Sequence, residues 1–156
     1  MPITATTLRD KRQTGREMYR LAGRFSGDLD AVKVRRGTRL RPLSTFSLPE
    51  IFDFVKSLPY RRDTRPIEVV GRPRTLLLGA NAGLDCKKKS VIMGAWLHRN
   101  RLPYRFMSVS TRPNRAIHHV FPQVRIDGTW LNLDATYSRY RPFQVKRVTA
   151  AEVLPR

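Results

Sequence analysis

The sequence predicts an α+β fold, in which a central helix carrying a cysteine is followed by an antiparallel β-sheet carrying a histidine and an aspartate. Residues 85–99 repeat apolar side chains at helical spacing, and this helix opens with Cys86. The pattern then changes to the short alternating runs that are typical of strands. Asp127-Gly128 is a strong hairpin signal between two such runs, which contain His119 and Asp134. A helix followed by antiparallel strands is an α+β arrangement.

The size and composition of the chain fit one globular domain. A chain of 156 residues is long enough to bury a single core, and a hydrophobic fraction of 40% excludes a disordered chain. No run approaches the roughly 18 apolar residues that a membrane helix requires. The N-terminus is polar and basic, unlike a signal peptide, and a single cysteine forms no internal disulfide. We therefore expect a cytosolic protein.

The chain is strongly basic. It has 31 Lys and Arg against 12 Asp and Glu, which gives a formal net charge of +19. Such a charge attracts nucleic acid, acidic proteins or anionic membrane surfaces. Arginine dominates, and its planar fork suits phosphate and carboxylate groups. The alternative is a solvated basic surface without a dedicated partner.

Residues 1–46 are expected to be a basic N-terminal extension or a peripheral part of the domain, and residues 47–156 to form its core. A helix over residues 5–24 has a narrow apolar face, and Val32 and Val34 alternate like the edge of a sheet. These patterns leave both possibilities open.

The core is expected to begin with two helices. Ser47-Leu48-Pro49-Glu50 has the form of a capping box and predicts a helix over residues 48–57. Residues 66–80 are expected to be a connector. The central helix then starts near Asp85 and ends near Arg99, with Asn100 in the left-handed conformation that closes a helix.

Three strands are expected after the central helix, over residues 104–110, 117–126 and 129–134. The Asp127-Gly128 turn joins the second strand to the third. Pro122 lies inside the second strand and lacks the N–H of a ladder hydrogen bond. It therefore favours an edge position or a bulge for that strand.

Cys86 is the candidate nucleophile. The thiolate is the attacking species, and it needs a positive local potential to form at neutral pH. The start of a helix supplies roughly half a positive charge through its unpaired N–H groups, and Lys87–Lys89 add to it. The backbone N–H of Cys86 is also the natural first donor to an oxyanion. The alternative is that Cys86 is a small buried apolar residue.

His119 and Asp134 are the candidate base and orienting acid. If Asp127 and Gly128 form the turn, His119 faces residue 136 and lies diagonal to Asp134 on the same side of the hairpin. Asp134 would then hold one ring nitrogen and leave the other to face Cys86. The alternative is a structural role for both side chains.

The remaining histidines are not expected to take part. His118 should point to the opposite side of its strand from His119. His98 lies too far along the central helix from Cys86 to reach it. Three histidines and one cysteine without close ligand spacing do not indicate a metal site, and no cofactor is expected.

Five segments of the chain resemble motifs of the transglutaminase-like (papain-like cysteine protease) superfamily. Gly83-Leu84-Asp85-Cys86 is similar to the nucleophile motif, and Leu102-Pro103 to the turn that follows the helix. The histidine strand, its turn and its partner strand are similar in His119-Val-Phe-Pro-Gln-Val, Asp127-Gly128-Thr129-Trp130 and Leu133-Asp134-Ala135-Thr136. The resemblance covers about residues 47–140.

The resemblance implies a papain-like core and an enzyme that transfers acyl groups through a cysteine thioester, with Cys86, His119 and Asp134 as its catalytic residues. It implies hydrolysis or transamidation of a peptide or isopeptide bond, and hence a protein or peptide substrate. Lys87–Lys89 stand where family members often have acidic residues, so the rim of the site is expected to be basic. Arg101 replaces the glycine of the family's turn.

A second function remains open, in which the same fold serves a basic structural protein of a viral or nucleoprotein assembly. Phosphate neutralisation favours this function. Interleaved aromatic and basic side chains would support stacking on single strands. The aromatic residues are Tyr104, Phe106, Tyr137, Tyr140 and Phe143, and the basic ones are Arg105, Arg139, Arg141 and Lys146. Ordinary strand amphipathicity is the alternative explanation of this pattern.

Overall fold

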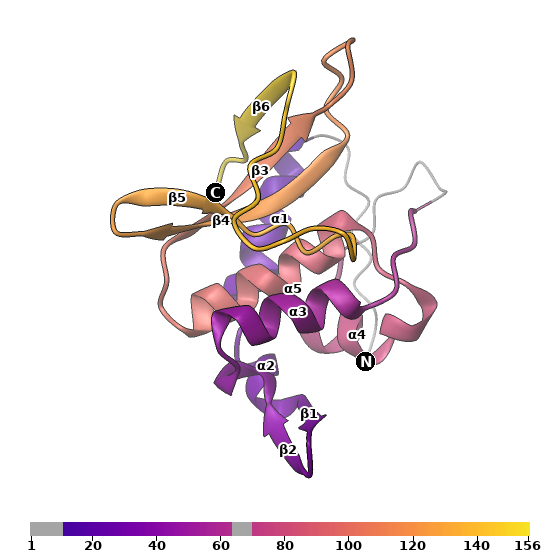
Figure 1. Ribbon diagram of the computed structural model, residues 1–156, viewed down its shortest axis with the longest axis vertical. Helices are drawn as coiled ribbons and strands as arrows, with labels where there is room; N and C mark the ends of the chain where they lie inside the picture. The colour runs from indigo at the N-terminus through magenta and orange to yellow at the C-terminus, as the bar shows by residue number, and fades with distance from the viewer. Residues whose placement is uncertain (1–10, 64–69) are drawn as a thin grey trace.

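The computed structural model describes residues 11–63 and 70–156. Its architecture is α+β, as the sequence predicts: a central helix packs against a four-stranded antiparallel sheet and against the other helices (Figure 1). A separate two-stranded hairpin projects at the end of the molecule away from the sheet. No helix in the described part of the chain is both long enough and apolar enough to cross a membrane.

The elements follow one another in a simple order. The first half contains α1 (Lys11–Arg24), α2 (Asp28–Ala31), β1 (Lys33–Arg36), β2 (Arg39–Pro42), the 3-10 turn η1 (Leu43–Thr45) and α3 (Leu48–Ser57). The second half contains α4 (Pro73–Leu78), the 3-10 turn η2 (Ala80–Ala82), α5 (Cys86–Arg99), β3 (Tyr104–Ser110), β4 (His119–Ile126), β5 (Thr129–Asn132) and β6 (Ala150–Val153).

Helix α5 is the core of the molecule. Its residues are buried on every face from Lys89 to Leu97, because it packs against β3 and β4 on one side and against α1, α3 and α4 on others. A helix that is buried all round belongs to the interior of a domain. Its observed bounds, with Asp85 as the N-cap, confirm the predicted helix that opens with Cys86.

The first helices frame α5. Helix α3 has the predicted bounds, and its capping box is formed by Ser47 and Glu50. Helix α1 confirms the described part of the helix expected over residues 5–24, whose residues 5–10 lie outside the described range. Met18, Leu21 and Ala22 of α1 are buried in the same hydrophobic cluster as the apolar residues of α5.

The sheet has the strand order β5-β4-β3-β6, with every pair antiparallel. Ile126 pairs with Thr129 around the turn, where Asp127 and Gly128 both have positive φ values of 49° and 79°. Two positive φ values define the type I′ turn, whose twist matches that of the strands. The predicted hairpin and its register are therefore confirmed.

The expectation that Pro122 marks an edge strand or a bulge is wrong, because β4 lies inside the sheet between β3 and β5. Phe106 of β3 pairs with Pro122 in continuous register. On the other side Leu133 donates its N–H to the Pro122 carbonyl at 2.9 Å, one residue after β5 ends at Asn132. The missing proline N–H thus falls where the β5 ladder stops, and an interior strand tolerates it there.

Two other expectations are corrected. Arg101, with φ 57°, takes the left-handed conformation after α5, whereas Asn100 has φ −91°. The side chain of Asn100 instead turns back to the carbonyl of Trp96 at 2.9 Å. Residues 73–78 of the expected connector form helix α4, which is too short for a helical period to be visible in the sequence.

Gly94 lies at a close contact between α5 and the sheet, and a substitution there tests this packing. A Cβ at this position would lie 2.6 Å from Cζ of the buried Phe106 and 3.4 Å from Cβ of Ala22. We expect Gly94→Ala to lower the free energy of unfolding by about 1–2 kcal/mol in a urea titration, even after the roughly 1 kcal/mol that alanine gains in helix propensity.

The same substitution at Gly27 is the matched control. Gly27 has helical φ and ψ values of −64° and −15°, and a Cβ there would meet nothing within 4 Å. We expect Gly27→Ala to raise the free energy of unfolding by about 0.5 kcal/mol. Equal effects of the two substitutions would contradict the packing described for Gly94.

Candidate active site

Cys86 is the first residue of α5, where the N–H groups of the helix have no helical acceptor. The carboxylate of the N-cap Asp85 accepts the N–H of Lys88 at 2.9 Å and thereby fixes the first turn. Cys86 is only 9% exposed. The structure therefore places the thiol in a small, partly covered space at the positive end of the central helix.

The side chains of Cys86, His119 and Asp134 lie together in one cluster. Nε2 of His119 lies 2.6 Å from Oδ2 of Asp134, and the Cys86 side chain lies close enough to His119 to help raise the pKa of the imidazole. Because Asp134 occupies Nε2, Nδ1 is the ring nitrogen left for the thiol. His119 opens β4, and Asp134 lies two residues beyond β5 rather than within the expected strand 129–134.

The Asp134 carboxylate is almost completely buried and receives three donors. Besides His119, Lys146 Nζ lies 3.1 Å from Oδ2, and the N–H of Thr136 donates to Oδ1 at 3.1 Å. Burial by itself would raise the pKa of Asp134, but the hydrogen bond and charge of His119, with smaller contributions from Thr136 and Lys146, hold it below its usual value. The carboxylate therefore stays ionised beside the imidazole.

His119 gains a proton from these neighbours. Burial opposes its protonation, but hydrogen bonds and charges from Asp134 and Cys86 outweigh burial and raise the pKa of His119 to about 9. Its ordinary value is 6.5. The stability that this protonated ring gives the fold is complete below about pH 6.5 and is lost as the pH rises through about 9.

Two tyrosines cover the site. The Tyr137 ring is stacked on the His119 ring at an interplanar angle of 17°, and Tyr60 packs on Tyr137 with 4.8 Å between ring centroids. Burial and the neighbouring Tyr137 raise the pKa of Tyr60, so its hydroxyl is neutral. The stacked Tyr137 ring covers one face of the His119 imidazole.

The three lysines after the nucleophile do not form the expected basic rim. Lys87 Nζ lies 3.1 Å from Asp85, and Lys88 Nζ lies 2.8 Å from Asp63. Lys89 is 2% exposed and points into the interior. Each ammonium group is thus engaged with a carboxylate or with carbonyl oxygens.

Asp63 and Asp85 lie close together next to the N-terminus of α5. Burial raises the pKa of Asp85, and the neighbouring Asp63 adds to this effect. For Asp63, burial acts in the same direction, but the hydrogen bond and charge of Lys88 prevail and lower its pKa. Lys87 and Lys88 therefore balance acidic groups that lie close to Cys86.

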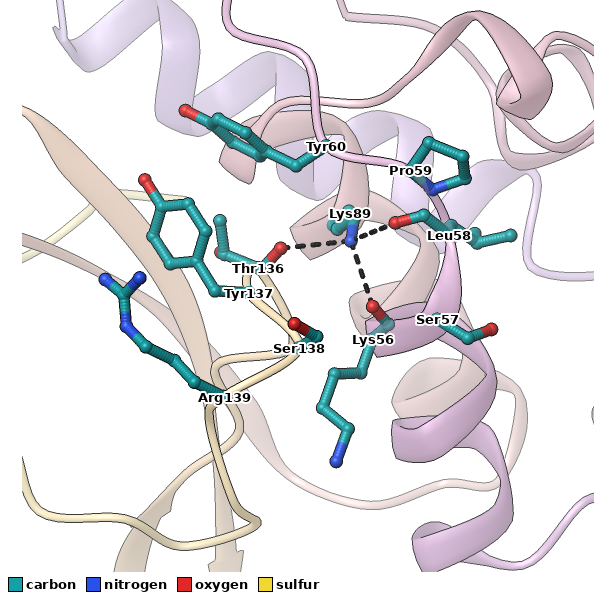
Figure 2. A pocket seen from close by; sticks show the side chains of 10 residues that line it. All are labelled: Lys56, Ser57, Leu58, Pro59, Tyr60, Lys89, Thr136, Tyr137, Ser138 and Arg139. Atoms are coloured by element: carbon teal, nitrogen blue, oxygen red, sulfur yellow. Dashed lines mark hydrogen bonds between the residues drawn. The ribbon is translucent and has the colours of Figure 1, made fainter.

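Lys89 ties three segments of the chain together beneath a pocket of about 310 Å³ (Figure 2). Its Nζ donates to the carbonyls of Leu58 at 2.6 Å, Thr136 at 3.0 Å and Lys56 at 3.4 Å. Burial lowers the pKa of Lys89 to about 8, so the ammonium form prevails at neutral pH. The pocket is lined by Lys56, Ser57, Leu58, Pro59, Tyr60, Lys89, Thr136, Tyr137, Ser138 and Arg139.

The position of Lys89 links the pocket to the candidate active site. Thr136 lies two residues after Asp134, and Tyr137, which stacks on His119, forms part of the pocket wall. The lysine therefore fixes the segment that carries the carboxylate against the end of α3. It also saturates its three donors in doing so.

The other two histidines lie elsewhere. Nε2 of His118 is 3.1 Å from the N–H of Thr111, at the exposed end of the sheet. Burial and nearby positive charges lower the pKa of His118. His98 lies in the last turn of α5, where Nδ1 is 3.5 Å from the hydroxyl of Tyr104. Neither ring belongs to the cluster of Cys86, His119 and Asp134.

Sequence reasoning missed four contributors to this site: Lys89, Lys146, Asp63 and the Tyr60–Tyr137 pair. The only sequence signal for Lys89 is its place in an otherwise apolar helix, three residues after Cys86. For the others the decisive contacts join segments that are remote in the chain. Nothing in their local sequence indicates those contacts.

Comparisons with known proteins add little to this description. No protein-family model matches the chain, and no curated protein matches it. Among solved structures, it is similar to one named as a putative cysteine protease from Cytophaga hutchinsonii, with a TM-score of 0.48 and 14% identity. The match covers 91% of this chain and 43% of that one, so this chain spans less than half the length of that protein.

Lys89 provides a test of how the site is held together. Replacing it with methionine keeps the length of the side chain but leaves three carbonyl oxygens without their donor. We expect Lys89→Met to lower the free energy of unfolding by about 3 kcal/mol in a urea titration.

Lys56→Met is the matched control, because its ammonium makes a 3.5 Å surface ion pair with Asp53 and lies 5.5 Å from the Phe52 ring centroid, but donates to no buried carbonyl in the described part of the chain. We expect a change within about 0.5 kcal/mol for this substitution. An unchanged or increased stability of Lys89→Met would mean that the buried ammonium is not what joins these segments.

Proposed function

We propose that the protein is a cysteine-dependent acyl-transfer enzyme with a transglutaminase-like, papain-like core, and that it hydrolyses a peptide or isopeptide bond. Cys86 is its nucleophile, His119 its general acid and base, and Asp134 the orienting acid. The observation that carries the proposal is the 2.6 Å hydrogen bond between His119 and the buried carboxylate of Asp134, with the Cys86 side chain close to the same imidazole. The place of Cys86 at the start of α5 supports it.

The first half of the reaction forms a thioester. The Cys86 sulfur attacks the carbonyl carbon of the amide, and the backbone N–H of Cys86 donates to the developing oxyanion. As the C–N bond breaks, protonated His119 gives its proton to the departing amine. The acyl group remains on the sulfur. Asp134 keeps the His119 ring in place while the ring loses its positive charge.

The second half returns the enzyme to its starting state. Water attacks the thioester carbonyl, His119 takes the proton of the water, and the C–S bond breaks to release the acid. An amine in place of water would give transamidation. We favour hydrolysis, because water is always available. In this proposal the pocket beside Tyr137 accepts a substrate segment next to the scissile bond.

Acylation by p-nitrophenyl acetate tests the proposal without knowledge of the natural substrate. We expect a burst of p-nitrophenol equal to the enzyme concentration, and an acetyl group on Cys86 that neutral hydroxylamine removes. Cys86→Ala should abolish the burst. His119→Ala should slow acylation by about 100-fold or more, because general acid–base groups typically contribute 10²–10⁴-fold.

His118→Ala is the matched control, since it removes the neighbouring imidazole, which contacts the N–H of Thr111 rather than Asp134. We expect it to acylate at the rate of the unmodified protein. Two results would contradict the proposal: acetylation of Cys86 no faster than that of N-acetylcysteine, or equal rates in the His118 and His119 variants.

A further inference from the structure

The β1–β2 hairpin carries a dense positive charge on a projecting ribbon. Figure 1 shows it at the end of the molecule away from β6 and the rest of the four-stranded sheet. Residues 33–42 contain five basic side chains and no acidic one. These are Lys33, Arg35, Arg36, Arg39 and Arg41.

Two of these cations brace the hairpin against the body of the protein. Arg41 donates to Glu50 at 2.9 Å and to the carbonyl of Thr45 at 2.8 Å. Arg36 lies 3.6 Å from the same carboxylate, and both guanidinium groups lie over the Phe46 ring. Phe46 itself is buried. Arg36 and Arg41 are therefore committed to internal contacts, whereas Arg39, on the same face of the ribbon, is exposed.

The other three cations are available to a partner. Lys33, Arg35 and Arg39 are exposed, and none of them forms an ion pair or hydrogen bond within residues 11–63 and 70–156. Arg39 faces Arg36 directly across the ribbon, an arrangement of like charges that costs stability. Lys33 and Arg35 share the outward face with Leu40, which is 59% exposed.

The ribbon is also held in a fixed conformation at both ends. Gly37, with φ 62°, makes the turn at its tip. At its base the N–H of Leu43 donates to the carbonyl of Val32 at 3.0 Å, and Leu43 is fully buried. The backbone that carries Lys33, Arg35 and Arg39 is thus held in one conformation before any partner binds, which reduces the entropy cost of binding.

The ribbon is a better candidate for binding nucleic acid than the aromatic and basic surface that is expected from the sequence. Tyr104 and Phe106 of that surface are buried, and Lys146 is turned inward to Asp134. A two-stranded β-ribbon, by contrast, enters the major groove of a duplex, which is about 12 Å wide. Arginine suits the phosphates along the groove, and an exposed leucine can contact base edges within it.

We propose that the β1–β2 hairpin is a binding ribbon for double-stranded DNA, with Lys33, Arg35 and Arg39 as its phosphate contacts. The ribbon lies apart from the sheet that carries His119, and binding there does not depend on the function proposed for Cys86. The ligand is recognised through its phosphate backbone, and so with little dependence on sequence.

The test is fluorescence anisotropy of a labelled mixed-sequence DNA duplex of about 20 base pairs, titrated with the full chain over a series of salt concentrations. The variant replaces Lys33, Arg35 and Arg39 by glutamine. We expect it to bind about tenfold more weakly or worse at low salt, with a salt slope smaller by about 2–3, since each duplex phosphate contact contributes about 0.9.

A second variant removes the same charge elsewhere, with glutamine at the exposed Arg112, Arg125 and Arg147. We expect this control to retain most of the affinity and the salt slope. The proposal is overturned if both variants lose affinity equally, or if the unmodified protein does not bind DNA at low salt. It is also overturned, in favour of an acidic protein partner, if poly-glutamate competes as well as unlabelled duplex and with the same dependence on the hairpin.

Discussion

The buried carboxylate of Asp134 is the interaction on which the candidate active site depends. A charge that is 2% exposed is costly unless donors surround it, and His119, Lys146 and Thr136 supply them. Two of these donors carry the positive charge that balances the carboxylate. The buried carboxylate thereby stabilises the protonated form of His119, whose imidazole lies next to Cys86. The segment that carries Asp134 is also held by Lys89, which donates to the carbonyl of Thr136 from the buried helix α5. One segment therefore connects the charged groups of the site to the packed core.

Helix α5 brings the two halves of the site together. It is buried against the sheet and against the other helices, so its N-terminus cannot shift relative to β4 without disturbing the core. Its first turn is fixed by Asp85, whose charge is balanced in turn by Lys87. The basic side chains therefore have different surroundings in different parts of the molecule. Near Cys86 the cations are engaged with carboxylates and carbonyls, whereas at the β1–β2 hairpin three of them face solvent without a described partner.

The sequence predicts the elements that depend on local chemistry. The capping box of α3, the start of α5 at Asp85 and the Asp127-Gly128 turn are set by a few neighbouring residues, and the turn also fixes the register that brings His119 near Asp134. The failures concern long-range contacts. Whether an interior strand tolerates Pro122 depends on where β5 stops, and the surroundings of Lys87–Lys89 depend on Asp63 and on loops remote in sequence. Periodicity carries no information on either.

The protonation state of His119 is the most direct test of this account, and an NMR titration of its ring measures it. The account predicts a midpoint near pH 9 in the intact protein and a clear fall in Asp134→Asn, because Asp134 is the largest source of the upward shift. His118 serves as an internal reference in the same spectra, since its pKa lies below the usual value of 6.5. A His119 midpoint near 6.5 that the Asp134 substitution leaves unchanged would contradict the coupling of these two side chains.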